Sequence, residues 1–339
     1  MGLNIYDVAR AAGVSTATVS RVMNGKPDVS PEVRRRVLQV IESLDFKPKV
    51  GRVELDTIAV FAPMDHFRLR YSTYFSDLLL GISYTVCDYD LNLELVSLRK
   101  MPKDPMQFTV FCRERRIRGG VFVLTLSTDY YVPELVKTGS FVVVGDHFGE
   151  GIPSVKSDNF GGGYKAAKHL VDIGHRRIGV IVTDIRFADH KQRVEGYRKA
   201  LADAGLSIDS SHYIDVGDSF SSGGDVEFRV RTMLSSANRP TALLMTNTTV
   251  AADVARIMDS AGLHIPDDMS VVGFDDDVWA VRLQPPLTTV RQPVFELGQA
   301  AAREAIALSN GEKEPSEVAV VLATDLIIRG STGALPVEG

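Results

Sequence analysis

The sequence predicts an all-α unit at the N-terminus, followed by an α/β core of two subdomains with parallel sheets. Three observations support this fold class. Residues 1–50 show three short helical patterns separated by turn residues. From residue 58 onward, short apolar runs alternate with amphipathic stretches, which is typical of parallel sheets covered on both faces. The length of 339 residues, of which 45% are hydrophobic, suffices for two or three folding units.

Charge is distributed unevenly along the chain. Residues 1–50 carry eight Lys or Arg and five Asp or Glu, a net charge of +3, whereas the remainder carries a net charge of −8. A basic module on an acidic body confines the attraction for phosphates to that module. The overall net charge of −5 therefore does not exclude a nucleic-acid partner.

The N-terminal unit is predicted to contain two short helices around a tight turn, and then a third helix. Gly13 can end the first helix with a positive φ angle, and Ser15 can cap the second. The third helix is expected to begin at Pro31, with Ser30 as its cap, and to continue to Leu44. Apolar residues at helical spacing would form the inner faces: Ile5, Val8, Ala9, Val14, Val19, Val22, Val33, Val37, Val40 and Ile41.

The second helix exposes small and polar side chains, which is what close entry into the DNA major groove requires. Arg21 can contact guanine with two hydrogen bonds, and Ala17 or the methyl group of Thr16 can touch a thymine methyl. Phosphate contacts, which position the module without reading sequence, are expected from Thr18, Ser20, Asn24, Arg34, Arg35 and Arg36. A generic three-helix bundle is the alternative, but it would not need this combination of caps, turn and outer surface.

Four segments of this unit form a long and specific signature: IYDVA at 5–9, AGVS at 12–15, TVSRVMN at 18–24 and VSPEVR at 29–34. They resemble the headpiece of the lactose-repressor/galactose-repressor (LacI/GalR) regulators, and the resemblance continues nearly to the C-terminus. It implies a DNA-binding headpiece at residues 1–48 in which Thr16, Ala17 and Arg21 read bases. It also implies that a homodimer binds a pseudo-palindromic, double-stranded operator.

The linker, residues 49–57, departs from the family pattern. Family members usually continue with Pro-Asn and a hinge helix, and two such helices insert leucines into the operator's minor groove. Here Lys49 follows Pro48, and Gly51 weakens a helix by about 1 kcal/mol relative to Ala. Lys49 and Leu55 are the linker residues expected to reach DNA. Leu55 has two interpretations, a minor-groove wedge at the family's spacing or a core residue beside the first strand.

The core is predicted to contain two parallel sheets. Strands are expected at 58–62, 93–98, 120–124, 141–144, 178–182, 242–246 and 270–274, with helices at 75–87, 163–173, 194–204, 226–234 and 250–261. The resemblance implies a periplasmic-binding-protein-like arrangement of residues 58–331. One subdomain would take 58–160 and 291–320, the other 161–290 and 321–331, with 332–339 as a tail. Ligands of open α/β sheets bind at the carboxyl ends of strands, so facing subdomains would create one cleft.

The resemblance also implies which core residues contact an effector. Polar contacts would come from Asp158, Arg193, Asn247, Asp275 and Gln292, and an aromatic wall from Tyr74, Phe75, Phe187, Phe220 and Trp279. Carboxylates and amides hydrogen-bond hydroxyl groups, and arginine supplies a fixed fork of donors. This combination favours a sugar or sugar derivative as the effector.

These residues also have structural interpretations. Asp158 could cap a helix, Asp275 a loop, and Arg193 could belong to a structural ion pair. The aromatic residues could be core or, for Trp279, part of a subunit interface. Thr248 stands where the family usually has an aspartate after asparagine, so the cleft has lost one carboxylate. A nucleobase-type metabolite or a partner protein is therefore an alternative to a sugar.

Several activities lack the patterns they require. The glycines at 161–163 have neither dinucleotide-fingerprint spacing nor a Walker lysine, and the aspartates at 275–277 have no histidine at ligand spacing. Cys87 and Cys112 are isolated, which argues against a disulfide framework or a zinc site. A non-enzyme without cofactors is therefore expected. No signal peptide or membrane span is found, so a cytoplasmic location is expected and a solute-binding module without a DNA role is disfavoured.

Together these observations predict a sequence-specific DNA-binding regulator, a repressor whose operator affinity is controlled by a small-molecule effector between the two core subdomains. Closure of the cleft would be a hinge motion, which is a suitable two-state element for a switch. No leucine heptad follows Arg329, so a homodimer is expected rather than a tetramer.

Overall fold

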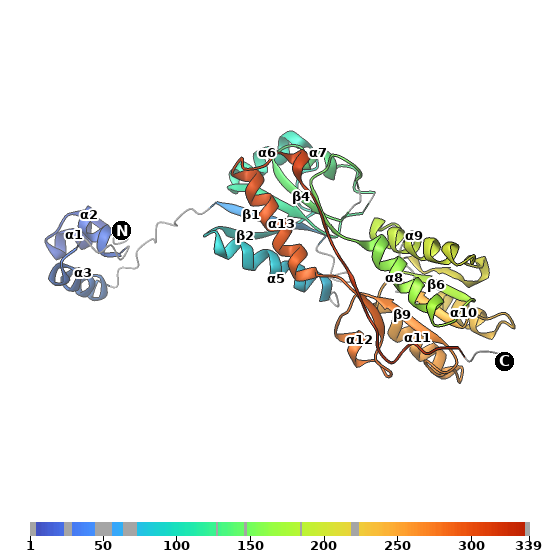
Figure 1. The fold of residues 1–339 in the computed structure, drawn as a ribbon. Coiled ribbons are helices and arrows are strands. Elements are labelled where there is room, and N and C mark those ends of the chain that lie inside the picture. The colour runs from blue at the N-terminus through green and yellow to red at the C-terminus, as the bar shows by residue number, and fades with distance from the viewer. Residues whose placement is uncertain are drawn as a thin grey trace. The chain divides into compact units, whose positions relative to one another are not determined.

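The chain divides after Leu55 into two units, Met1–Leu55 and Asp56–Gly339 (Figure 1). The computed structural model describes residues 5–23, 29–44, 56–63, 73–126, 128–145, 148–183, 185–217 and 224–335. Three DNA-contact predictions, Asn24, Lys49 and Leu55, and one effector-contact prediction, Phe220, lie outside these residues. Within the described part of the chain, no helix combines the length and apolar character needed to cross a bilayer.

The N-terminal unit contains the three predicted helices, α1 (Ile5–Ala12), α2 (Thr16–Met23) and α3 (Pro31–Ser43). Gly13, with a φ of 63°, ends α1, and Ser15 Oγ accepts a hydrogen bond from Thr18 N–H at 3.1 Å at the start of α2. Ser30 Oγ accepts one from Val33 N–H at 3.4 Å. The helices enclose a small core of buried residues: Val8, Ala9, Ala12, Val19, Val22 and Val37. Periodicity and capping in the sequence therefore predicted this unit correctly.

The first sheet of the core is entirely parallel. Its strands are β1 (Thr57–Ala62), β2 (Asn92–Ser97), β3 (Ile117–Phe122), β4 (Ser140–Val144), β5 (Ser154–Ser157) and β11 (Ala319–Leu322), in the order β11-β5-β4-β3-β1-β2. Helices α5 (Thr73–Asp88) and α13 (Val294–Ser309) share a core with one face, and α6 (Pro105–Glu114) and α7 (Val132–Val136) share a core with the other. Alternate β1 side chains enter the two cores, which explains its unbroken apolar sequence.

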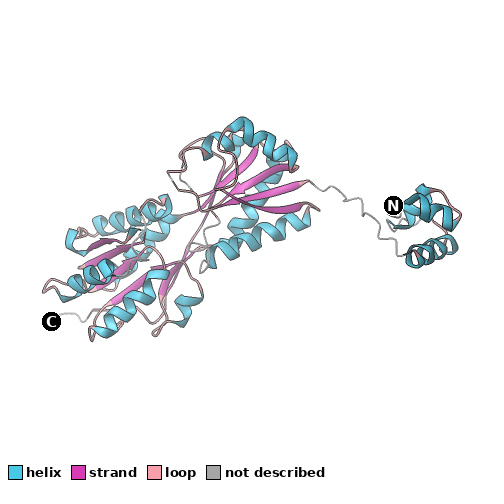
Figure 2. Cartoon of the chain, turned by 180° about the vertical axis from the view of Figure 1, so that it is seen from behind, coloured by secondary structure: helices cyan, strands magenta, loops and turns pink. Residues whose placement is uncertain are grey.

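The second sheet contains β6 (Ile178–Val182), β7 (Tyr213–Asp215), β8 (Ala242–Met245), β9 (Ser270–Phe274), β10 (Thr288–Arg291) and β12 (Asp325–Ile327), in the order β12-β10-β9-β8-β6-β7. All neighbours are parallel except β10 and β12. One face shares a core with α8 (Asn159–Asp172) and α9 (Ala188–Asp203). The other is covered by α10 (Gly224–Ser235), α11 (Thr249–Ser260) and α12 (Val278–Arg282), and Figure 2 shows the strands between these helical layers. Two 3-10 turns, at Ser210–His212 and Pro315–Glu317, complete the described elements.

The chain passes between the two sheets three times. It leaves the first sheet after β5 to form α8, returns after β10 through α13, and leaves again between β11 and β12. Because β11 ends at Leu322, the last crossing lies slightly beyond the expected boundary at residue 320. Such multiple crossings make the two subdomains parts of one unit.

Two helix crossings are so close that a side chain would not fit. A Cβ atom at Gly81 of α5 would lie 2.0 Å from the carbonyl oxygen of Phe295 in α13. A Cβ atom at Gly163 of α8 would lie 2.3 Å from the carbonyl oxygen of Arg193 in α9. The glycine run at 161–163 is therefore explained by packing, and it fixes the position of the helix that carries Arg193.

Candidate functional site

The first candidate site is the outer face of α2. Ala17 and Arg21, one helical turn apart, are both exposed, and Thr16 and Ser20 beside them are half-buried. Thr18 also takes part in the cap, since its Oγ1 lies 2.9 Å from Ser15 Oγ. This face can enter a groove closely, because its members are short except for one guanidinium.

Phosphate contacts were expected from α3 as well. Arg34 is half-buried there, whereas Arg35 and Arg36 are exposed. These side chains provide positive charge on a second helix of the same unit, as a DNA backbone contact needs.

The second candidate site lies where strands of the second sheet end. Asp275 follows β9 with a φ of 76°, a left-handed conformation that directs the chain sharply away from the strand. Its carboxylate accepts hydrogen bonds from Asn247 Nδ2, at 3.1 Å, and from Gln292 Nε2, and it lies 3.6 Å from Arg193 Nη1. Three residues predicted by resemblance, from α9 and from the segments after β8 and β10, therefore converge on the carboxylate of a fourth, which follows β9.

Arg193 is almost completely buried and has several partners. Its Nε donates to Asn159 Oδ1 at 2.8 Å, and its Nη1 donates to the carbonyl oxygen of Thr246 at 2.6 Å. The guanidinium carbon lies 3.8 Å from the ring centroid of Phe274, a cation–π contact. Arg193 thus forms the structural ion pair that the sequence left as an alternative, and its charge is matched by Asp275.

Thr248 stands at the position where the resemblance predicts an aspartate. It is fully buried, and its Oγ1 lies 2.8 Å from the carbonyl oxygen of Phe274 and 2.6 Å from that of Asp275. A neutral hydroxyl here joins the ends of two neighbouring strands. The second carboxylate is therefore replaced by a group that stabilises the backbone of Asp275.

The three consecutive aspartates have three different environments. Asp276 pairs with Arg291 and Arg329; burial opposes its ionisation, but the hydrogen bonds from these arginines hold its pKa below the ordinary value. Asp277 accepts hydrogen bonds from two N–H groups at the start of α12, and burial raises its pKa. Each aspartate is thus engaged by different protein groups, and the described residues contain no cluster of three metal-ligating side chains.

Helix α5 of the first subdomain reaches this site. Thr73 Oγ1 donates to Asp277 Oδ2 at 3.4 Å, which is a hydrogen bond between the two subdomains. The pKa of the neighbouring Tyr74 is raised, first by burial and then by the charges of Asp189 and Asp275, and Arg193 opposes this rise. Tyr74 is therefore a neutral hydroxyl in the field of the carboxylates, and both subdomains contribute to one site.

The other predicted residues are more dispersed. Asp158 caps α8, where it accepts a hydrogen bond from Gly161 N–H at 2.7 Å, and Phe75 belongs to the core of the first subdomain. Phe187 precedes α9, with its ring 5.4 Å from that of His190. Trp279 is 44% exposed on α12. The structure thus supports the structural interpretations of Asp158 and Phe75.

Sequence reasoning missed two polar residues at strand ends. Asp189 lies in the first turn of α9, and its Oδ1 is buried without a hydrogen-bond partner among the described residues. Thr125, which follows β3, is fully buried, and its Oγ1 also lacks a partner within that part of the chain. The available signal was position, since both residues follow strands at the edge where open α/β sheets bind ligands.

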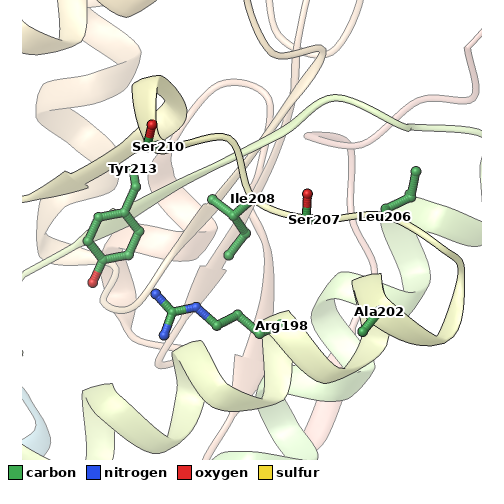
Figure 3. Close-up of a pocket in the computed structure, with 7 residues that line it drawn as sticks. All are labelled: Arg198, Ala202, Leu206, Ser207, Ile208, Ser210 and Tyr213. Carbon is green, nitrogen blue, oxygen red and sulfur yellow. The ribbon is translucent and has the colours of Figure 1, made fainter.

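A separate hollow of about 480 Å³ lies between the C-terminal half of α9 and the segment that leads to β7 (Figure 3). Its lining consists of Arg198, Ala202, Leu206, Ser207, Ile208, Ser210 and Tyr213. The guanidinium carbon of Arg198 lies 5.7 Å from the ring centroid of Tyr213. None of these residues contacts Asp275, so the hollow is distinct from the strand-end site.

Comparisons with known proteins agree with this architecture. Residues 4–49 match the family described as bacterial regulatory proteins, lacI family, and residues 167–332 match the periplasmic binding protein-like domain. The HTH-type transcriptional regulator DegA of Bacillus subtilis (strain 168) is 30% identical over 345 residues, which cover 99% of each protein.

Two solved structures resemble the whole chain. A transcriptional regulator CelR–cellobiose complex is 27% identical and superposes with a TM-score of 0.71 over 97% of this chain and all of that one. The lac repressor dimer bound to operator and the anti-inducer ONPF is 23% identical and gives a TM-score of 0.76, covering 98% of this chain and 99% of that one. The second likeness shows the fold alone.

Proposed function

Because the chain belongs to the LacI family of bacterial regulatory proteins, and is thus a DNA-binding transcriptional regulator with an effector-binding core, we propose that it is a homodimeric repressor controlled by a sugar-like effector. The effector would bind between the subdomains, beside Asp275 and Tyr74. Operator DNA would be contacted by Thr16, Ala17 and Arg21 at bases and by Ser20 and neighbouring basic residues at phosphates.

The observation that carries the effector proposal is the meeting of α5 with the strand ends of the second sheet. Thr73 and Tyr74 come from one subdomain, whereas Asp275 and Asp277 come from the other. A ligand here would contact both parts and would favour one arrangement of them over another. Differential binding of this kind typically couples two sites by about 1–3 kcal/mol.

The named relatives support a hydroxylated ligand. The solved CelR structure contains cellobiose, and another relative, 30% identical over 337 residues, is the ribose operon repressor of Haemophilus influenzae. Amide and carboxylate groups such as those of Asn247, Asp275 and Gln292 suit the hydroxyl groups of such molecules. The lac repressor structure contains a dimer on its operator, which is the arrangement proposed for this chain.

The DNA-binding part of the proposal can be tested by selecting operators from random DNA with the full-length protein. The selected site should be a pseudo-palindrome with half-sites about one helical turn apart. Arg21→Ala should weaken binding by about 1–3 kcal/mol and relax the preference at one guanine per half-site. Lys137→Ala, an exposed charge on α7 that pairs with Glu134, is the matched control and should leave affinity unchanged. If Arg21→Ala lost the same affinity for every DNA sequence, this result would contradict base reading by Arg21.

The effector part requires a separate experiment. Thermal unfolding of the full chain would be followed against a panel of sugars, sugar phosphates, nucleobases and amino sugars. A compound that binds only the folded protein must raise the unfolding temperature, and it should also change operator affinity. If no compound in the panel did either, the small-molecule proposal would fail, and a partner protein would become the better candidate signal.

A further inference from the structure

The charges at the strand-end site do not balance. Two carboxylates, Asp189 and Asp275, and one guanidinium, that of Arg193, act electrostatically on Tyr74, and a third carboxylate, Asp277, interacts with Asp275. Arg193 is matched by Asp275 at 3.6 Å and is further held by Asn159 and the carbonyl oxygen of Thr246. It has therefore little capacity left to neutralise a second carboxylate.

Two of the three carboxylates are accounted for by protein groups. Asp275 accepts hydrogen bonds from Asn247 and Gln292 in addition to its ion pair. Asp277 accepts two backbone hydrogen bonds at the start of α12 and one from Thr73. These contacts explain why both residues are present without any ligand.

Asp189 is the exception. Its Oδ1 is buried, yet no described residue hydrogen-bonds to it, including Arg186 and His190 on the same segment. Asp189 lies in the first turn of α9. A buried carboxylate oxygen without a donor is costly, and natural proteins keep such groups chiefly where something else binds them.

An independent observation comes from the opposite subdomain. Thr125, beyond the carboxyl end of β3, is fully buried with an unpartnered Oγ1. Tyr74, on α5, lies within the electrostatic field of Asp189 and stays a neutral hydroxyl. The first subdomain thus contributes an unpartnered hydroxyl after a strand and an aromatic ring, and the second contributes the unpartnered Oδ1 of Asp189.

We propose that the effector carries a positively charged amino group, as an amino sugar does, and that its ammonium group pairs with Asp189. This inference deepens the proposed function and rests on it. The ammonium supplies the hydrogen-bond donors and the charge that Asp189 lacks, and the ring of Tyr74 adds a cation–π contact. The hydroxyl groups of the same ligand would use Thr125 and the amides of Asn247 and Gln292.

The test is a comparison of matched ligands by isothermal titration calorimetry on the full-length protein. The probes are glucosamine, galactosamine, mannosamine and 3-amino-3-deoxyglucose, each beside its N-acetyl derivative and its parent sugar. At least one amine should bind about thirtyfold or more tightly than both neutral counterparts, since loss of one member of a buried charge pair has at least this effect. Asp189→Asn should remove that preference, whereas Asp259→Asn, an exposed aspartate on α11, should preserve it.

A structural role for Asp189 would give a different result. If Asp189 stabilised the fold as Asp158 does by capping, Asp189→Asn would lower the unfolding temperature of the free protein. The proposal requires an unchanged or higher unfolding temperature, because the buried Oδ1 makes no hydrogen bond that the substitution could remove. The same variant thus separates ligand recognition from folding.

Each remaining outcome is decisive. A neutral sugar that binds wild type and Asp189→Asn equally, with no amine preferred, would overturn the cationic ligand and leave the proposed function intact. Binding of sodium or potassium ions that is lost in Asp189→Asn, without an amine effect, would assign the carboxylate to an inorganic cation instead. If no compound of any class bound, the small-molecule part of the proposed function would fail as well.

Discussion

Arg193→Met should destabilise the core strongly. The side chains of Arg193 and Asp275 are only 4% and 16% exposed, so their ion pair is largely removed from water. Removal of one member of a buried pair leaves an uncompensated charge, which costs about 3–5 kcal/mol. The substitution also leaves Asn159 Oδ1 and the carbonyl oxygen of Thr246 without their donors. Methionine keeps much of the side-chain volume, so we expect a loss near the middle of that range, about 4 kcal/mol.

A second variant, Asp275→Asn, tests whether loss of the ion pair causes the loss of stability. Asp275→Asn leaves the guanidinium charge of Arg193 unmatched but retains an acceptor for Asn247 or Gln292, and we expect a loss of about 3 kcal/mol. In the double variant neither charge is left alone, so the combined loss should be smaller than the sum of the two single losses. The difference, the coupling energy, should be about 2 kcal/mol or more, as expected for residues within one ion-pair network.

The assay is urea unfolding of the ligand-free protein, followed by circular dichroism at fixed protein concentration. Lys191→Met, at an exposed position on the same helix, is the matched control and should change the free energy of unfolding by less than about 0.5 kcal/mol. Two results would refute the reasoning. One is a loss below about 1 kcal/mol for Arg193→Met, and the other is strict additivity of the two single substitutions.

Three further predictions concern other parts of the chain. Ser15→Ala removes the acceptor for Thr18 N–H and should cost the headpiece about 1 kcal/mol, so operator binding should be lost at a lower temperature while the core transition stays unchanged. Gly163→Ala brings a Cβ within 2.3 Å of the Arg193 carbonyl oxygen and should cost about 1–3 kcal/mol in core unfolding; an unchanged transition would contradict the close crossing. Burial lowers the pKa of His175 below its ordinary value of 6.5, so the unfolded chain binds more protons as pH falls through that value and stability declines. The difference in unfolding temperature between pH 7.5 and pH 5.5 should therefore shrink in His175→Gln, and an equal difference would argue against this contribution.

The headpiece was predictable nearly residue by residue because its determinants are local. Gly13, Ser15 and Pro31 act on neighbouring residues, and Val8 and Val19 follow helical spacing. In the core, long apolar strands such as 178–182 were equally clear. Helix α13 was not predicted, because its alanine-rich stretch around 300–305 gives only a weak apolar pattern, although the helix packs on β3, β4 and α5.

Short strands at or next to the edges of the sheets were also missed. Strands β5, β7 and β11 have three or four residues each and acquire their conformation from neighbouring strands rather than from their own composition. The crossing after Leu322 depends on the same long-range pairing. Such features are set by tertiary context, which a local pattern does not contain.

The residues of the strand-end site were also only partly predicted from the sequence. The resemblance selected Arg193, Asn247, Asp275 and Gln292, and the structure brings them together. The resemblance could not indicate that the other three would contact Asp275, because these contacts depend on the relative positions of α9 and three strands. Asp189 was overlooked for the opposite reason, since its distinguishing property is the absence of a partner among the described residues.

At the strand-end site, the residues whose orientation is fixed by protein contacts differ from the residue proposed to select the ligand. Asn247 and Gln292 are held by Asp275 through one N–H each, and on Gln292 this leaves the side-chain carbonyl oxygen and the second N–H as potential ligand contacts. Because their orientations are fixed in advance, little conformational entropy is lost when a hydroxylated ligand binds them. Residues held in this way suit many ligands with hydroxyl groups and discriminate weakly among them. Discrimination must then come from groups that no protein partner satisfies, and among the described residues of this site Asp189 is the charged one.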